Sequence, residues 1–325
     1  MFRSLFGPGD QSVLTSCGCF SAKAGEMVED LPLRAQEELV RASGGDSPAL
    51  WRLLAEAGYD VVVFARNTAA STVFGVHHVD RRTRVVLLPL AQHGLLLGMS
   101  VLDYLWGRVD SVVVTTETER ATMERHLMGA APVWNSGFVL RVNPLALAAA
   151  PHGYVESQRN LVVAGDWRES KEHGWAERWS RILRAELGDD IRLRVVGPGA
   201  MNVLREGGER LTSSRLDVWR WVSRAVAVID PGTHRLLGRD VLEAMMFGTP
   251  VVVSAHGGAS REHAQVGNGG LWYRTEPELL ACAEALLDPD FRRGLSDQGR
   301  SYAANGYADT DRYVSSVVKA VLEEE

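Results

Sequence analysis

Cysteine and lysine are scarce in this chain of 325 residues, and each scarcity limits what the protein can be. The three cysteines include Cys17 and Cys19, which have neither a matching second pair nor a histidine at metal-ligand spacing. This pattern favours free thiols in a reducing compartment over a disulfide framework or a metal site. Lys23, Lys171 and Lys319 are the only lysines, so each of them is a candidate for a specific role.

A long apolar run and a strong charge of one sign are absent as well. The longest apolar stretch, residues 85–102, is interrupted by Pro89, His93 and Gly94, which favours a strand followed by a helix over a membrane span. Glycine and proline precede any apolar region at the N-terminus, so no signal peptide is expected. The net charge of -6 argues against a general binder of nucleic acids or membrane surfaces. We therefore expect a globular protein without a transmembrane segment, in the cytoplasm or peripheral to a membrane.

Short apolar segments alternate with amphipathic ones along most of the chain. This alternation predicts an α/β fold with parallel sheets, and we expect two Rossmann-like domains that face a central cleft. The stretch 143–157 has the composition of a linker, so we place an N-terminal domain at 1–150 and a C-terminal domain at 151–325. The predicted strands are residues 59–65, 85–88, 111–115, 159–164, 191–196, 225–229, 251–253 and 270–273. The predicted helices are residues 31–42, 48–57, 93–106, 116–128, 175–187, 215–223, 276–287 and 290–305, with a further helix between Gly238 and Gly248.

Several common catalytic motifs are missing. The sequence has no G-x-G-x-x-G between a strand and a helix, no P-loop and no G-x-S-x-G elbow, and His263 beside Ser260 is no more than chance supplies. Polar, glycine-containing loops follow four predicted strands of the second half, at residues 165–171, 197–199, 231–238 and 256–262. Because open α/β sheets bind ligands at the carboxyl ends of their strands, we expect the site at these loops.

One carboxylate, Glu243, stands inside an apolar segment in the middle of this half. The sequence G-R-D-V-L-E-A-M-M-F-G-T-P-V-V-V-S begins at Gly238, and its apolar residues recur at helical spacing before a short run of valines. A strand precedes it, so the unit is predicted as a βαβ crossover. Glu243 would then be a helix residue within reach of the ligand crevice.

Further motifs surround this segment in a fixed order within residues 159–305. They are Gly165 with Lys171 six places later, G-P-G at 197–199, the segment from Gly238, G-G-A-S-R-E at 257–262, G-L-W-Y at 270–273 and E-P-E-L at 276–279. Their order and spacing resemble the retaining, nucleotide-sugar-dependent glycosyltransferases of the GT-B fold, the family 4-like group with a Glu-x7-Glu pattern. In the first half only residues 111–138 look similar, with V-W-N-S-G-F in place of the family's I-P-N-G-V.

The resemblance implies roles for individual residues. Glu243 matches the second glutamate of the pattern, which accepts hydrogen bonds from the ribose hydroxyls of the donor nucleotide. Lys171 matches a lysine that contacts the donor diphosphate, and Arg168 is the candidate to replace the family's arginine, whose position holds Asp166. The glycines that match the donor-binding loops are Gly165, Gly199, Gly238, Gly257 and Gly258.

The sequence departs from the family at Arg235, where the first glutamate of the pattern is expected. An arginine would repel positive charge that develops at the anomeric carbon, but it could bind the diphosphate or a carboxylated sugar. Either the donor site is rebuilt or catalysis is impaired. On the acceptor side the candidate is His93, which follows a predicted strand where the family often places a histidine.

The predicted function is transfer of a sugar from a nucleotide diphosphate sugar, UDP- or GDP-sugar first, to an acceptor hydroxyl. The family scheme implies retention without a metal or other cofactor. The acceptor stays open among a small molecule, a glycan, a lipid carrier and a nucleic-acid base. Two alternatives remain: a non-catalytic nucleotide-sugar-binding or scaffold protein, favoured by Arg235, and a GT-B-like nucleotide-sugar epimerase.

Overall fold

The chain divides into two compact units in a computed structural model. One unit comprises Met1–Phe138 and Thr310–Glu325, and the other comprises Val139–Asp309. The predicted boundary at residue 150 lies outside the described residues, and the last helix belongs to the first unit rather than to the C-terminal domain in which the sequence had placed it. The structure describes residues 60–65, 79, 81–88, 107–140, 147, 159–164, 173–196, 215–233 and 237–322.

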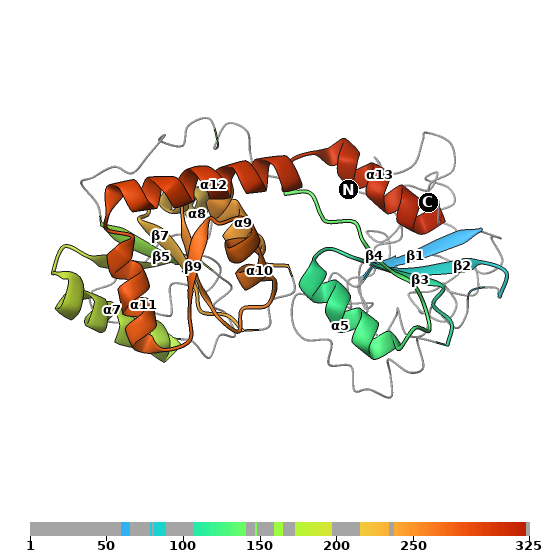
Figure 1. The fold of residues 1–325 in the computed structure, drawn as a ribbon, viewed down its shortest axis with the longest axis horizontal. Helices are drawn as coiled ribbons and strands as arrows, with labels where there is room; N and C mark the ends of the chain where they lie inside the picture. Colours follow the sequence, from blue (N-terminus) through green and yellow to red (C-terminus); the bar gives the residue numbers. More distant parts are fainter. Residues whose placement is uncertain are drawn as a thin grey trace, which may run out of the picture. The chain divides into compact units, whose positions relative to one another are not determined.

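The first unit contains a four-stranded parallel sheet in the order β1-β2-β3-β4. Its strands are β1 (Val61–Ala65), β2 (Arg84–Leu88), β3 (Ser111–Val114) and β4 (Val133–Asn135). Strand β3 is buried at every position, as expected for a parallel strand that is covered on both faces. Helices α5 (Glu117–Leu127) and α13 (Thr310–Leu322) flank this sheet in Figure 1.

The sequence predicted three of these strands and helix α5, and the structure confirms them. Strand β4 and helix α13 were not predicted. The predicted helices 31–42, 48–57 and 93–106 lie outside the described residues.

The second unit contains a five-stranded parallel sheet in the order β6-β5-β7-β8-β9. Its strands, all predicted, are β5 (Asn160–Ala164), β6 (Arg192–Val196), β7 (Ala227–Asp230), β8 (Val251–Ser254) and β9 (Gly270–Tyr273). The chain runs from β5 outward to β6 and then returns to the other side of β5 at β7. The topological switch point of this doubly wound sheet therefore lies between β5 and β7, where ligands bind at the carboxyl ends.

Helices cover this sheet and bury a continuous apolar core (Figure 1). Trp179 and Leu183 of one helix pack with Ile229, Val252 and other strand residues. Thr275 and Glu278 form a capping box at the start of α11. The helices are α7 (His173–Leu187), α8 (Arg215–Val222), α9 (Arg239–Met246), α10 (Ala259–Val266), α11 (Glu276–Ala285) and α12 (Pro289–Tyr307), of which only α10 was not predicted.

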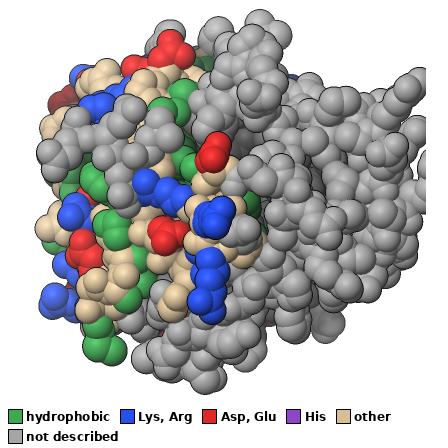
Figure 2. All heavy atoms as spheres, turned by 90° about the vertical axis from the view of Figure 1, so that its right-hand side faces the viewer, with side chains coloured by type: hydrophobic (Ala, Val, Ile, Leu, Met, Phe, Trp, Pro, Cys, Tyr) green, Lys and Arg blue, Asp and Glu red, His purple; other side chains and the backbone are tan. Residues whose placement is uncertain are grey.

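Charges of both signs are mixed on the surface. Figure 2 shows one face of the molecule, and on its described part basic, acidic and apolar side chains are interspersed. Within the arginine-rich helices, Arg178 pairs with Glu276 and Arg220 pairs with Asp217. None of the helices in the described ranges is long and apolar enough to cross a membrane.

Candidate functional site

The candidate site lies where β7 and β8 end and helices α9 and α10 begin, next to the switch point of the five-stranded sheet. Four residues predicted for it are described, namely Gly238, Glu243, Gly257 and Gly258. The other predicted site residues lie outside the described residues, and they are His93, Gly165, Arg168, Lys171, Gly199 and Arg235.

Glu243 is buried, with 3% of its surface exposed, and each of its carboxylate oxygens has a hydrogen-bond donor. The indole nitrogen of Trp219 donates to Oε2 over 3.0 Å, and Arg239 Nε donates to Oε1 over 2.9 Å. Buried carboxylates require such partners, since an isolated charge in the interior is costly. Glu243 therefore lies in a helix, as predicted, and its buried carboxylate is held in one orientation at the second turn of α9. The sequence did not predict either of its two partners.

Gly238 allows α9 to begin in close contact with α10. It is the N-cap residue of α9 and has a left-handed φ of 57°. A Cβ at this position would lie 2.8 Å from Cδ2 of His263 and 3.0 Å from the backbone nitrogen of Ser260. Only glycine satisfies both the backbone conformation and the space.

Gly257 and Gly258 place the start of α10 against the end of β8. A Cβ on Gly257 would lie 2.8 Å from the carbonyl oxygen of Ser254, and Gly258 is the N-cap residue with a φ of 60°. The two glycines therefore allow the chain to turn tightly from β8 into α10.

Asp230 ties the loop after β7 to the first turn of α10. It is the last residue of β7 and is buried. Its Oδ2 accepts a 2.6 Å hydrogen bond from the Ser260 hydroxyl, and its Oδ1 accepts a 2.9 Å bond from the nitrogen of Gly232. The sequence predicted a loop at residues 231–238 and assigned no role to Asp230. The structure makes it the anchor of that loop.

His263 holds the residue before Gly238 in place. Its Nε2 lies 3.1 Å from the carbonyl oxygen of Leu237, and its Nδ1 lies 3.1 Å from the hydroxyl of Tyr302. A carbonyl only accepts, so Nε2 carries the proton. Burial lowers the pKa of His263 to about 4, so the ring is neutral at pH 7.

Two tyrosines complete this buried cluster. The hydroxyls of Tyr302 and Tyr307 lie 3.1 Å apart, and the Tyr307 ring meets His263 edge to face at 5.3 Å. Burial raises the pKa of both tyrosines, so their hydroxyls stay protonated and a proton is available to donate to His263 Nδ1. The cluster thus links the loop before α9 to helices α10 and α12.

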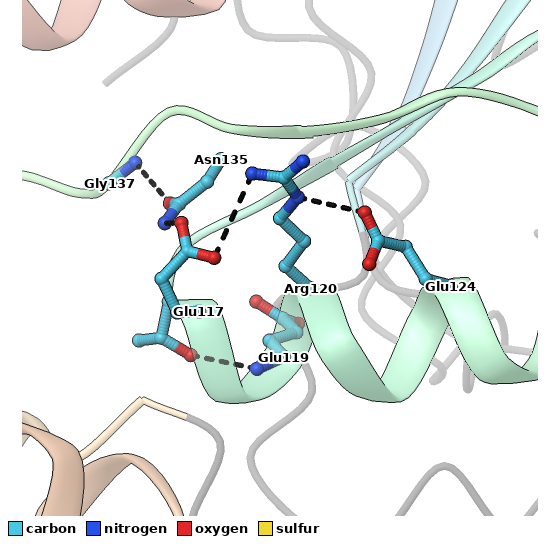
Figure 3. A network of polar contacts seen from close by, with 7 residues as sticks. Glu117, Glu119, Arg120, Glu124, Asn135 and Gly137 are labelled. Carbon is cyan, nitrogen blue, oxygen red and sulfur yellow. Dashed lines mark hydrogen bonds and ion pairs between the residues drawn. The ribbon is translucent and has the colours of Figure 1, made fainter.

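The first unit has a polar network of its own at the start of α5 (Figure 3). Asn135 at the end of β4 donates to Glu117 over 2.6 Å and accepts from the nitrogen of Gly137 over 3.0 Å. Arg120 pairs with Glu117 and, through Nε, with Glu124 at 2.9 Å. The asparagine of the V-W-N-S-G-F motif therefore connects β4 to the first turn of α5.

Glu119 is the buried acid of this unit. Its Oε2 accepts hydrogen bonds of 2.8 Å from both the nitrogen and the hydroxyl of Thr115, while its own nitrogen is bonded to the Thr116 hydroxyl. Burial raises the pKa of Glu119. This arrangement caps α5 and fixes the end of β3.

A metal site is not apparent in the described part of the chain. No group of three or more His, Cys, Asp or Glu side chains there could hold a metal ion.

A family model matches most of the second unit. Residues 158–288 match the family model described as Glycosyl transferases group 1. This segment contains Glu243, the glycines at the start of α9 and α10, and Asp230. No curated protein matches the chain by sequence.

Solved structures resemble the whole fold. Sucrose-phosphate synthase from Thermosynechococcus elongatus has a TM-score of 0.64 at 15% identity, over 93% of this chain and 82% of that chain. An alpha,alpha-trehalose-phosphate synthase (UDP-forming) from Burkholderia vietnamiensis has a TM-score of 0.60 at 10% identity, over 92% and 82%. The pneumococcal O-GlcNAc transferase GtfA in complex with UDP and GlcNAc has a TM-score of 0.60 at 13% identity, over 85% of this chain and 60% of that chain.

These likenesses confirm the predicted GT-B fold with its two Rossmann-like domains. The match of residues 158–288 to the model of Glycosyl transferases group 1 supports a transferase enzyme that acts on glycosyl groups.

Proposed function

We propose that this protein transfers a sugar from a nucleotide diphosphate sugar to an acceptor hydroxyl. The observation that carries the proposal is Glu243, a buried carboxylate beside the switch point of the sheet and inside the segment that matches the family model. A carboxylate can receive both hydroxyls of a ribose, and the amides at the start of α9 favour a bound phosphate. Trp219 holds the carboxylate in place through its hydrogen bond to Oε2.

The proposed chemistry needs charge neutralisation at the diphosphate. The bond between the anomeric carbon and the diphosphate oxygen breaks, the acceptor oxygen bonds to that carbon on the same face, and the hydroxyl proton passes to the departing diphosphate. Lys171 and Arg168, together with the amides of α9, would stabilise the negative charge of the leaving group. The resemblance to retaining enzymes supports retention and independence of metal ions.

The donor nucleotide is proposed to be UDP first and GDP second. The trehalose-phosphate synthase is described as UDP-forming, and the O-GlcNAc transferase was solved with UDP. The acceptor class stays open. The scarcity of cysteine supports a cytoplasmic location.

A non-catalytic nucleotide-sugar-binding protein is the second candidate, and Arg235 favours it. An arginine in place of the family's first glutamate would oppose positive charge at the anomeric carbon. Substitution Arg235→Glu separates the two candidates. A binder would gain slow donor hydrolysis from the restored glutamate, whereas a transferase that depends on Arg235 would lose turnover.

The test of the proposed function is titration calorimetry with UDP, GDP, ADP and dTDP, each with magnesium and with EDTA. We expect one nucleotide to bind at micromolar concentration under both conditions, and binding to be lost in Glu243→Gln and Glu243→Ala. Glu124→Gln is the matched control, because Glu124 accepts from an arginine Nε at the same 2.9 Å in the other unit. If the wild-type protein binds none of the nucleotides, the proposed function is wrong.

A further inference from the structure

We infer that Arg239 is a specificity residue of the donor site, which exchanges its ion pair with Glu243 for the diphosphate of the donor. The exchange releases Oε1 of Glu243 for a ribose hydroxyl. The inference rests on the proposed function, since it assigns a donor to the same site. Arg239 lies outside the Glu-x7-Glu pattern and was not among the predicted site residues.

The exposure of the two partners makes the exchange possible. Arg239 Nε lies 2.9 Å from Glu243 Oε1, and the Arg239 side chain is 45% exposed whereas that of Glu243 is 4% exposed. Because the Arg239 side chain is partly exposed, its guanidinium can turn away from Glu243 without disturbing the core. Glu243 stays in position during this change, because Trp219 donates to its other oxygen.

The position of Arg239 in α9 is a poor one for helix stability alone. It is the first residue of the helix, where the dipole favours anions over cations. An arginine four residues before a glutamate is also the less favourable order for an ion pair along a helix. A cation here is well placed for a phosphate, since a guanidinium binds phosphate oxygens in a bidentate manner and the amides of a first turn point towards a bound anion.

The neighbouring charge strengthens this argument. Asp240 follows in the same first turn and would repel a diphosphate at this end of α9. Arg239 offsets that repulsion when its guanidinium turns from Glu243 to the phosphates. For a nucleoside, the ion pair of Arg239 with Glu243 competes with binding of the ribose. For a nucleoside diphosphate, the guanidinium gains the phosphates as a new partner when it leaves Glu243, so Arg239 favours binding.

Loss of the Arg239 cation should therefore change the affinities for nucleosides and for nucleoside diphosphates in opposite directions. A nucleoside without phosphates must displace Arg239 from Glu243 and offers it no new partner, so Arg239→Leu should bind uridine or guanosine about threefold more tightly. The same substitution should weaken UDP or GDP binding by about tenfold or more, as expected for loss of a charged hydrogen bond. Arg239→Lys keeps the cation and should restore most of the diphosphate affinity.

Titration calorimetry with UDP, GDP, uridine and guanosine on the wild-type and variant proteins measures both effects. The matched control is Arg120→Leu, which removes an Nε to Oε1 pair of the same 2.9 Å length and the same spacing, but with a carboxylate that is 50% exposed. It should leave all four affinities unchanged. Thermal unfolding of each variant verifies that the protein is folded.

Three outcomes would overturn the inference. If Arg239→Leu weakens nucleoside and diphosphate binding by the same factor, Arg239 only neutralises Glu243. If it changes neither affinity while Glu243→Gln abolishes binding, the proposed function stands and the role of Arg239 falls. If the wild-type protein binds no nucleotide diphosphate, both fall together.

Discussion

The indole nitrogen of Trp219 donates a 3.0 Å hydrogen bond to the buried carboxylate of Glu243. Trp219 lies in α8, 24 residues before Glu243 in the chain. The Trp219 ring also packs against Phe247 at a centroid distance of 6.1 Å, just after α9 ends. Helix α8 therefore fixes both the side chain of Glu243 and the end of the helix that carries it. This contact orients the acid.

Removal of the indole donor should weaken the site. We expect Trp219→Phe to lower the free energy of unfolding by about 1–3 kcal/mol, because a buried carboxylate oxygen loses its partner. Nucleotide affinity should fall by about tenfold, since Glu243 is then free to turn. Urea unfolding and titration calorimetry measure the two effects.

Trp179→Phe is the matched control for this substitution. Trp179 is also buried and packs against another aromatic ring, Trp175, at 5.9 Å. Within the described structure its indole nitrogen has no hydrogen-bond partner, so the control removes ring volume without breaking a bond. An equal loss of nucleotide affinity in both variants would show that the bond to Glu243 is not the cause.

Gly238 should tolerate no side chain. Gly238→Ala forces an alanine into a left-handed conformation at a cost of about 1–2 kcal/mol. The new methyl group would also lie 2.8 Å from a carbon of His263, and overpacking of this kind costs about 1–3 kcal/mol more. We expect a lower melting temperature and weaker nucleotide binding, because the start of α9 must shift.

Gly294→Ala provides the contrast in the same unit. Gly294 lies inside α12, and a Cβ there would meet nothing within 4 Å. This substitution should raise stability by about 0.5–1 kcal/mol through helix propensity, and it should leave nucleotide binding unchanged. A stabilising Gly238→Ala would contradict the geometry of the α9 and α10 contact.

The bond between Ser260 and Asp230 should contribute to the stability of the second unit. Ser260→Ala removes a 2.6 Å donor from a buried carboxylate, and hydrogen bonds to charged groups are worth about 1.5–3 kcal/mol. Ser296→Ala is the control, since the Ser296 hydroxyl bonds back to the carbonyl of Arg292 in its own helix. Urea unfolding should show a clear loss for the first variant and almost none for the second.

The elements that the sequence predicted correctly are those with a strong local signal. Strands such as β7 and β8 are fully buried in a parallel sheet, so they consist of continuous apolar runs. Helix α9 is bounded by Gly238 and Gly248, which both have positive φ. By contrast, β4 has only three residues, and the packing of α13 in the first unit depends on contacts far apart in the chain.

The contacts within the candidate site were not predictable for the same reason. The partners of His263 are Leu237, Tyr302 and Tyr307, which lie 26, 39 and 44 residues away. In the sequence, the proximity of His263 to Ser260 was no more than chance supplies. Its contact with Leu237 follows only from the fold. Arg239 had a local signal, since it precedes Glu243 by four residues in a predicted helix.

His263 should make the stability of the protein depend on pH. Burial lowers the pKa of this residue from 6.5 to about 4, so the unfolded chain binds a proton in this pH range that the folded protein does not bind. Neutral His263 contributes fully to the free energy of unfolding above pH 6.5. This contribution, about 3 kcal/mol in total, is lost as the pH falls towards 4.

Urea unfolding of wild-type protein and His263→Gln between pH 4.5 and 7.5 measures this contribution. The glutamine amide can donate to the carbonyl of Leu237 but does not titrate, so the variant lacks the His263 part of the pH dependence. Glu119, whose raised pKa has the opposite effect, is present in both proteins and cancels in their difference. The stability advantage of the wild-type protein should shrink as the pH falls. If this advantage is the same at every pH, His263 is not held neutral by burial, and the charged groups around it, Glu262 above all, have a larger influence than its desolvation.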